Sequence, residues 1–164
     1  GLVIIGIFIM FLVLFRNIKI SLIGIIPNFI AAFAILGLIG MLNIPLDMMT
    51  ITIAAITIGI AVDNSIHYIY RFKEEYEKNQ NYEDSIRLCH STVGVAILNT
   101  SITIIFGFSI LVLSNFIPTI YFGVFTGIAM FLAMILVLTL LPSLILYIQP
   151  FEKRLNVWSI FEFF

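Results

Sequence analysis

The chain has 164 residues, of which 62% are hydrophobic and 10% charged, and its formal net charge is −1. Because a soluble domain usually carries about 25% charged residues, this composition excludes an ordinary soluble enzyme and predicts an integral membrane protein. The single cysteine, Cys89, excludes a disulfide within the chain. The sequence begins at Gly1 inside an apolar run without a basic leader, so we expect a piece of a longer polypeptide rather than a signal peptide.

Five apolar segments stand out, each near the roughly 20 residues that a membrane-spanning helix needs. In chain order they are Leu2–Phe15, Ile20–Leu42, Met48–Tyr70, Val93–Leu113 and Thr119–Ile148. The expected fold is therefore all-α: a polytopic membrane bundle of five transmembrane helices that occupies residues 1–148.

The basic residues all lie on one side of this predicted bundle. The first connection, the third connection and the tail hold two, four and two of the eight Lys and Arg residues, and the other two connections hold none. Since cytoplasmic loops are enriched in Lys and Arg, these segments are expected to be cytoplasmic. Residues 71–92 then form a cytoplasmic helical connection broken at Asn79-Gln80-Asn81, with a solvated charged linker as the alternative, and residues 149–164 form a cytoplasmic tail.

The third segment carries an acidic side chain, Asp63, among apolar residues. An aspartate at the centre of a membrane helix costs about 2.5–3.5 kcal/mol on insertion scales, so it normally faces protein or a water-filled cavity. At 100° per residue, Asp63 shares one helix face with His67 and with Gly59, which would let a neighbouring helix or a water approach. We predict a proton relay of Asp63, Asn64 and His67. A structural aspartate and an interfacial histidine without a coupling role are the alternatives.

Other polar and small residues provide supporting candidates. Asn99 and Thr103 share a face of the fourth segment and are expected either to solvate Asp63 or to hold helices together. Gly123 and Gly127 in the fifth segment match the small-xxx-small spacing of close helix packing, which we expect to be structural.

Several motifs are absent from the sequence. It contains no Walker loop, no His-Glu-x-x-His zinc signature and no Gly-x-Ser-x-Gly elbow, and Asp63 has no second acid within a predicted span. We therefore expect neither an enzyme nor a bound cofactor or metal, and no nucleic-acid partner. The expected partners are the lipid bilayer, the rest of a longer protein and a hydrophobic substrate.

The stretch from Gly59 to Glu75 resembles the fourth helix of a half-transporter of the resistance-nodulation-division (RND) superfamily. It is similar in particular to the MMPL-like and predicted-exporter branch, which has a Gly-x-x-x-Asp signature here and is related to sterol-sensing domains. Pro118–Gly123 and Leu140–Leu144 also look like segments of this family, so that the resemblance covers nearly the whole chain.

The resemblance implies two repeats of six helices with an extracytoplasmic domain after the first helix of each. This chain would be helices two to six of one half, and its Ala61–His67 stretch is more similar to a second half, that is, to helices eight to twelve. The implied function is export of lipids or other hydrophobic molecules, driven by the proton motive force across a bacterial inner membrane. Asp63 would be in the relay, with its partner on the missing half, because Asn64 stands where the family often has an acidic or aromatic residue. The alternative is a non-transporting sterol- or lipid-sensing module.

Overall fold

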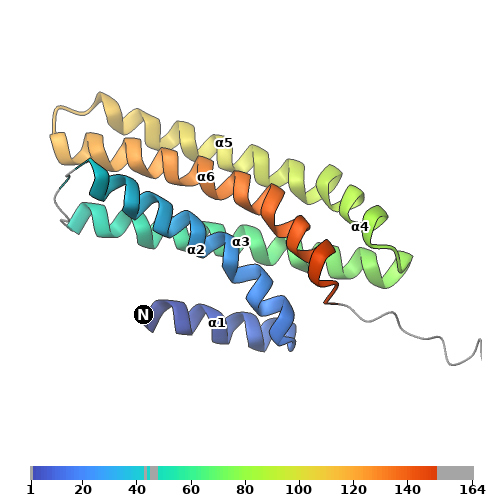
Figure 1. Ribbon diagram of the computed structural model, residues 1–164. Helices are drawn as coiled ribbons and strands as arrows, with labels where there is room; N and C mark the ends of the chain where they lie inside the picture. Colours follow the sequence, from blue (N-terminus) through green and yellow to red (C-terminus); the bar gives the residue numbers. More distant parts are fainter. Residues whose placement is uncertain (1, 43, 45–47, 151–164) are drawn as a thin grey trace, which may run out of the picture.

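In a computed structural model of the chain, which describes residues 2–42, 44 and 48–150, the regular structure is entirely helical (Figure 1). The elements are α1 (Leu2–Phe15), α2 (Ile18–Met41), α3 (Met48–Asn79), α4 (Tyr82–Cys89), the π-helical turn η1 (His90–Gly94), α5 (Val95–Ser109), the 3-10 turn η2 (Ile110–Leu113) and α6 (Ile117–Ile148). The predicted all-α membrane bundle is confirmed. From residue 151 onward, the expected cytoplasmic tail lies outside the described residues.

Four stretches of the described chain are helical, long and apolar enough to cross a membrane, namely Ile18–Met41, Ile51–Asn79, Tyr82–Leu113 and Ile117–Ile148, and Ile5–Phe15 is a shorter apolar helix. The third and fourth predicted segments are parts of longer helices. α3 continues past Tyr70 to Asn79, and α4 leads through η1 into α5. The connection expected at 71–92 is thus two helical arms that extend the spans.

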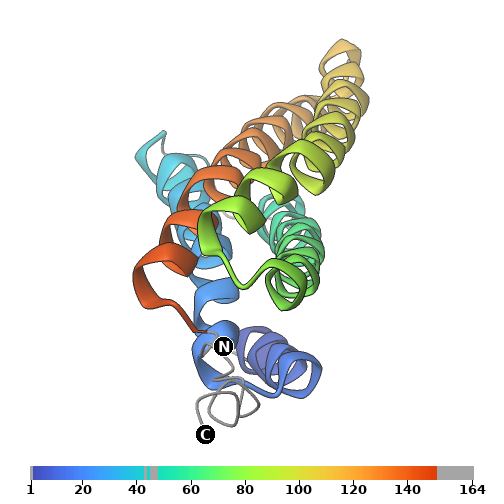
Figure 2. The same cartoon turned by 90° about the vertical axis from the view of Figure 1, so that its right-hand side faces the viewer.

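α6 is the central helix of the bundle. It packs against α2, α3 and α5, and α2 also packs against α3 (Figure 2). α1 lies beside α2 at the edge (Figure 1). There Gly24 of α2 is so close to α1 that an added Cβ would collide with the ring of Phe11. The stretch Tyr82–Leu113, which contains α5, is covered least, since only 11% of its apolar 18-residue window is buried. One side of the bundle is therefore open along α5.

Three helices end in the same way, at residues in the left-handed conformation. Arg16, Gln80 and Gln149 have φ values of 50°, 52° and 43°, and the N–H of each donates to the carbonyl four residues earlier at 2.9 Å. This conformation closes a helix end by satisfying one of its last carbonyls. Asn17 and Asn81 follow two of these residues, and each caps the next helix by accepting a hydrogen bond from a backbone N–H. These ends are at the segments that carry the basic residues.

A buried polar pair joins α2 to α3. Asn28 Nδ2 lies 2.7 Å from its own-helix carbonyl of Gly24 and 3.2 Å from Ser65 Oγ, while the Ser65 hydroxyl donates to the carbonyl of Ala61 at 2.9 Å. Asn28 and Ser65 are 3% and 0% exposed. The hydrogen bonds of these two side chains therefore lie inside the bundle, where an unpaired amide is costly. The pair fixes which faces of α2 and α3 meet.

Ser65→Ala is expected to destabilise the full-length protein by about 0.5–1.5 kcal/mol, because Asn28 loses its partner on α3. The measurement is the apparent Tm of the purified protein in detergent. Ser143→Ala is the matched control, since the exposed Ser143 hydroxyl donates only to the carbonyl of Thr139 in its own helix. Equal Tm values for the two variants would contradict the role of the pair.

Candidate functional site

Asp63 lies on an open face of α3. Its side chain is 69% exposed and that of His67 is 67% exposed, with His67 Nε2 3.4 Å from Asp63 Oδ1. At 1.5 Å per residue, Asp63 is about 12 Å along α3 from Arg71, the first basic residue of that helix, and about 22 Å from Met48 at the other end. The carboxylate is thus well inside the apolar length of the helix, where an uncovered charge is expensive.

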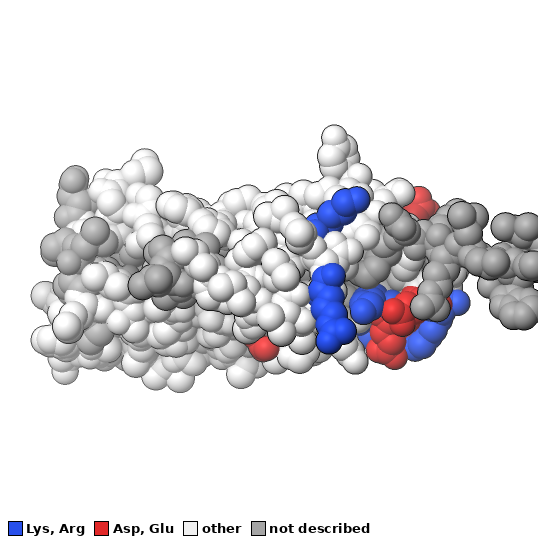
Figure 3. All heavy atoms as spheres, turned by 90° about the horizontal axis from the view of Figure 1, so that it is seen from below, with Lys and Arg blue, Asp and Glu red and all other residues white. Residues whose placement is uncertain are grey.

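The charged side chains lie mainly at one end of the molecule. Seen from below in the space-filling view, Lys, Arg, Asp and Glu gather at that end, and a single acidic group stands apart within the apolar part of the face (Figure 3). Among the described residues of 48–70, Asp63 is the only acid, and this stretch holds no Lys or Arg. The candidate site is therefore separate from the charged end.

A groove of about 580 Å³ runs between α3 and α5 and contains Asp63. Residues from α3 form one wall, and η1 and α5 form the other. The lining residues are Gly59, Ile60, Asp63, Asn64, His67, Val93, Ala96, Ile97, Thr100 and Ile104. Most of the wall on the α5 side is apolar, and the Thr100 hydroxyl donates to the carbonyl of Ala96 at 2.9 Å. In this groove a carboxylate, an amide, an imidazole and a hydroxyl face one space.

The structure brings the three predicted relay residues Asp63, Asn64 and His67 to this groove, but not the two predicted supporting residues. Asn99 and Thr103 are exposed and are not part of the groove lining. The polar residue that α5 contributes to the lining is Thr100. Helical periodicity identifies residues that share a face, but it does not tell which face of α5 meets α3. The spacing of Val93, Ile97, Thr100 and Ile104 at intervals of three and four residues marks the lining face.

The three predicted packing glycines differ in their surroundings. A Cβ at Gly123 would lie 2.7 Å from the Phe108 carbonyl oxygen and 2.9 Å from Leu111 Cβ, so α6 and the end of α5 approach closely there. A Cβ at Gly59 or Gly127 would meet no atom within 4 Å. Within the described chain, neither is a point of close helix approach. Gly59 lines the groove, where its missing side chain widens the space next to Asp63.

A second, smaller cavity of about 90 Å³ lies among α1, α2 and α3. Its lining is apolar apart from Asn28, whose amide is engaged with Ser65. The lining residues are Ile7, Ile25, Asn28, Phe29, Ala32, Phe33, Leu36, Ile58 and Val62. This space suits a hydrocarbon group rather than a polar ligand.

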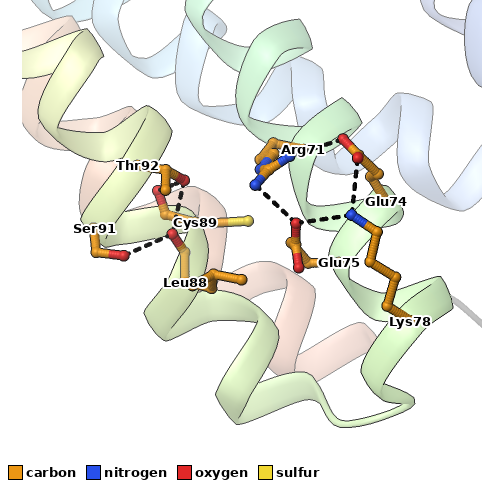
Figure 4. A network of polar contacts seen from close by, with 8 residues as sticks. All are labelled: Arg71, Glu74, Glu75, Lys78, Leu88, Cys89, Ser91 and Thr92. Atoms are coloured by element: carbon orange, nitrogen blue, oxygen red, sulfur yellow. Dashed lines mark hydrogen bonds and ion pairs between the residues drawn. The ribbon is translucent and has the colours of Figure 1, made fainter.

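The far end of α3, in the connection expected to be cytoplasmic, carries an ion-pair network (Figure 4). Arg71 contacts Glu74 at 3.0 Å and the buried Glu75 at 2.8 Å, and Lys78 reaches the same two carboxylates at 3.0 and 3.4 Å. Hydrogen bonds from Lys78 and Arg71 hold the pKa of the Glu74 carboxyl below its usual range. The network pairs residues three and four apart, which explains why this polar stretch continues the helix.

Within the described residues, no group of three His, Cys, Asp or Glu side chains could hold a metal ion.

Comparisons with known proteins agree with the helical membrane fold. Residues 1–160 match the profile of the MMPL family. The protein MJ1562 of Methanocaldococcus jannaschii, described as a membrane protein, is 34% identical over 156 residues, which are 93% of this chain and 40% of that protein. The hopanoid transporter HpnN of Burkholderia multivorans is 28% identical over 125 residues, 73% of this chain and 13% of that protein.

The chain therefore spans less than half the length of these two relatives. No solved structure matches it.

Proposed function

The chain belongs to the MMPL family of the RND superfamily, and from this premise we propose that it forms the transmembrane core of one half of an exporter driven by the proton motive force. Asp63 is the proton-binding group, and Asn64 and His67 complete the site on this half. The cargo is a lipid or another hydrophobic molecule, which the relative named as a hopanoid transporter supports. The proposed location is a bacterial inner membrane, with the basic connections in the cytoplasm.

The observation that carries this proposal is the 69% exposure of Asp63 at membrane depth. A carboxylate cannot remain against lipid without cost, so another protein surface must cover the open face of α3 and α5. The chain covers only 40% and 13% of its two relatives, which leaves room for such a surface on the missing part of the protein. When that surface covers the groove, the Asp63 carboxylate is enclosed with only a few other polar groups.

Proton binding would change the contacts that α3 makes. Ionised Asp63 attracts a positively charged or hydrogen-bond-donating partner, and the His67 imidazole lies 3.4 Å from its carboxylate. Protonated Asp63 is neutral and packs against the apolar wall formed by Ile97 and Ile104 without that partner. The two protonation states thus favour different surroundings for the groove face of α3, and a difference of this kind is what a transport cycle needs.

Transport by the full-length protein in proteoliposomes tests the proposal. We expect movement of a labelled lipid cargo to require an imposed pH gradient and to stop when an uncoupler collapses it. Liposomes with the same lipid composition but without protein are the blank. Cargo movement of equal rate with and without the gradient would overturn proton coupling.

The apolar cavity among α1, α2 and α3 favours a second candidate, a lipid-sensing module that does not transport. In that case an apolar end of a lipid or sterol enters the cavity, and signalling passes to a partner. Lipid binding would then be independent of pH and unchanged by Asp63→Asn, whereas Ala32→Phe, at a buried lining position, would abolish it. Under the exporter proposal, Asp63→Asn removes transport whatever happens at this cavity.

A further inference from the structure

One histidine that is not part of the lining of the Asp63 groove joins α3 to α6. His90 is the first residue of η1. Its Nε2 lies 3.0 Å from the carbonyl oxygen of Leu138 on α6, and its Nδ1 lies 2.8 Å from the hydroxyl oxygen of Tyr68 on α3. Tyr68 is completely buried, and the two rings meet edge to face with centroids 5.7 Å apart. A single imidazole therefore bridges two of the bundle's long helices.

The carbonyl that His90 reaches is one that α6 itself cannot satisfy. In an α-helix the N–H of each residue donates to the carbonyl four residues earlier. Pro142 lies inside α6, four residues after Leu138, and proline has no N–H. The Leu138 carbonyl is thus left without its helical donor, and the His90 ring occupies the vacant position.

The chemistry of the three neighbours assigns the proton on this ring. A carbonyl oxygen only accepts, so Nε2 carries the hydrogen and donates to Leu138. In the neutral ring Nδ1 is then an acceptor, and the Tyr68 hydroxyl can donate to it. The Ile86 carbonyl oxygen also lies 3.3 Å from Nδ1, but the reverse tautomer would leave Nε2 and the Leu138 oxygen facing each other at 3.0 Å without a hydrogen.

The bridge connects two points at which helices bend easily. Proline and π-helical turns are both common sites of helix bending, and π turns occur often at functional sites. η1 contacts the turn of α6 that leads to Pro142 through the hydrogen bond from His90 to Leu138, and a Cβ at Gly94 would lie 3.7 Å from Leu138 Cδ2. Cys89, directly before His90, is fully buried, and its thiol points toward Arg71 and Glu75 of α3 (Figure 4). Movement of η1 away from α3 would expose this thiol.

We propose that His90 is a latch. Bound to Leu138 and Tyr68, it holds η1 against α6 and keeps α6 in its present course at Pro142. Released, it leaves α6 free to bend there and separates the start of α5 from α3. This proposal concerns only the position of η1 and the bend of α6 at Pro142, and it does not depend on whether Asp63 binds protons.

A double-mutant cycle on the full-length purified protein tests the link between His90 and Pro142. His90→Ala is expected to lower the apparent Tm by roughly 2–6 °C, because the Leu138 carbonyl loses its donor. In a Pro142→Ala background, the backbone N–H of the new alanine supplies that donor, so His90→Ala should lower Tm by less than half as much. An equal loss in both backgrounds overturns the proposal.

The cycle remains decisive if His90→Ala does not fold by itself. Recovery of folded protein on adding Pro142→Ala supports the latch, since it restores the missing donor, and failure to fold in both backgrounds overturns it.

The labelling rate of Cys89 by a membrane-permeant maleimide tests opening directly, in membranes that contain the full-length protein. We expect His90→Ala to accelerate labelling by about ten-fold, the factor that corresponds to the loss of one such hydrogen bond. Ser91→Ala is the matched control, because the exposed Ser91 hydroxyl donates only to the carbonyl of Leu88 at 2.9 Å. A Cys89→Ser protein gives the signal from cysteines elsewhere. An unchanged rate in His90→Ala contradicts the latch.

Discussion

Asp63→Asn is expected to abolish proton-driven transport by the full-length protein and to leave its amount in the membrane unchanged. Asparagine has nearly the same shape as aspartate but cannot bind and release a proton at this position. Because the Asp63 side chain is 69% exposed within this part of the protein, the change leaves no packing defect among the described helices. Loss of a positioned proton-transfer group typically lowers a rate by about 10²–10⁴-fold. The measurement is cargo movement in vesicles with an imposed pH gradient.

Asp84→Asn is the control for this experiment. It makes the same chemical change at an exposed acid on α4, where Asn81 Nδ2 contacts Asp84 Oδ2 at 2.8 Å. Transport should be close to that of the parent protein, since Asp84 lies beyond the predicted spans. Asp63→Glu, which keeps a titrating group in the groove, should retain part of the activity. Full gradient-dependent transport by Asp63→Asn would contradict the proton-binding role of Asp63.

The main features of the fold could be predicted because they depend on local sequence. Apolar runs of about 20 residues specify spanning helices wherever a bilayer is the solvent. The break at Asn79-Gln80-Asn81 was also predictable, because asparagine favours helix caps and turns, and α3 does end at Asn79. The extension of α3 through its charged end follows from pairs three and four residues apart, such as Arg71 with Glu74 and Glu75. None of these features requires knowledge of a distant contact.

The details of the site depend on contacts between helices, which one sequence does not specify. Asn99 and Thr103 are as polar as Thr100, and only the packing of α5 on α6 decides that Thr100 lines the groove. The bridge from His90 to Leu138 likewise joins residues 48 positions apart. Pro142 was the available signal, since a proline inside a helix leaves a carbonyl that some other donor must reach.

The open face of α3 and α5 is the surface on which we expect another part of the protein to pack. α6 packs against α2, α3 and α5, whereas in the stretch Tyr82–Leu113, which contains α5, only 11% of the apolar 18-residue window is buried. A membrane helix can leave an apolar face toward lipid without cost, but Asp63 and His67 lie on the same open side. We therefore expect the missing part of the protein to meet the groove and to place a hydrogen-bonding or charged group opposite Asp63.

Gly123→Ala is expected to destabilise the full-length protein by about 1–3 kcal/mol, as overpacking of a close contact usually does. The added methyl group would lie 2.7 Å from the Phe108 carbonyl oxygen and 2.9 Å from Leu111 Cβ. The carbonyl oxygen belongs to the backbone, so α6 and the end of α5 must move apart to accept the methyl group. Apparent Tm in detergent measures the loss.

Gly127→Ala, one turn further along the same helix, is the matched control. A Cβ there meets no atom within 4 Å, and alanine favours a helix over glycine by about 1 kcal/mol. This variant should therefore be as stable as the parent protein or slightly more stable, and equal losses for the two variants would contradict the packing seen at Gly123.

The effect of Gly123→Ala should also reach the groove, because α5 supplies the wall opposite Asp63. Separation of α5 from α6 displaces that wall, so we expect transport to fall in Gly123→Ala and to remain in Gly127→Ala.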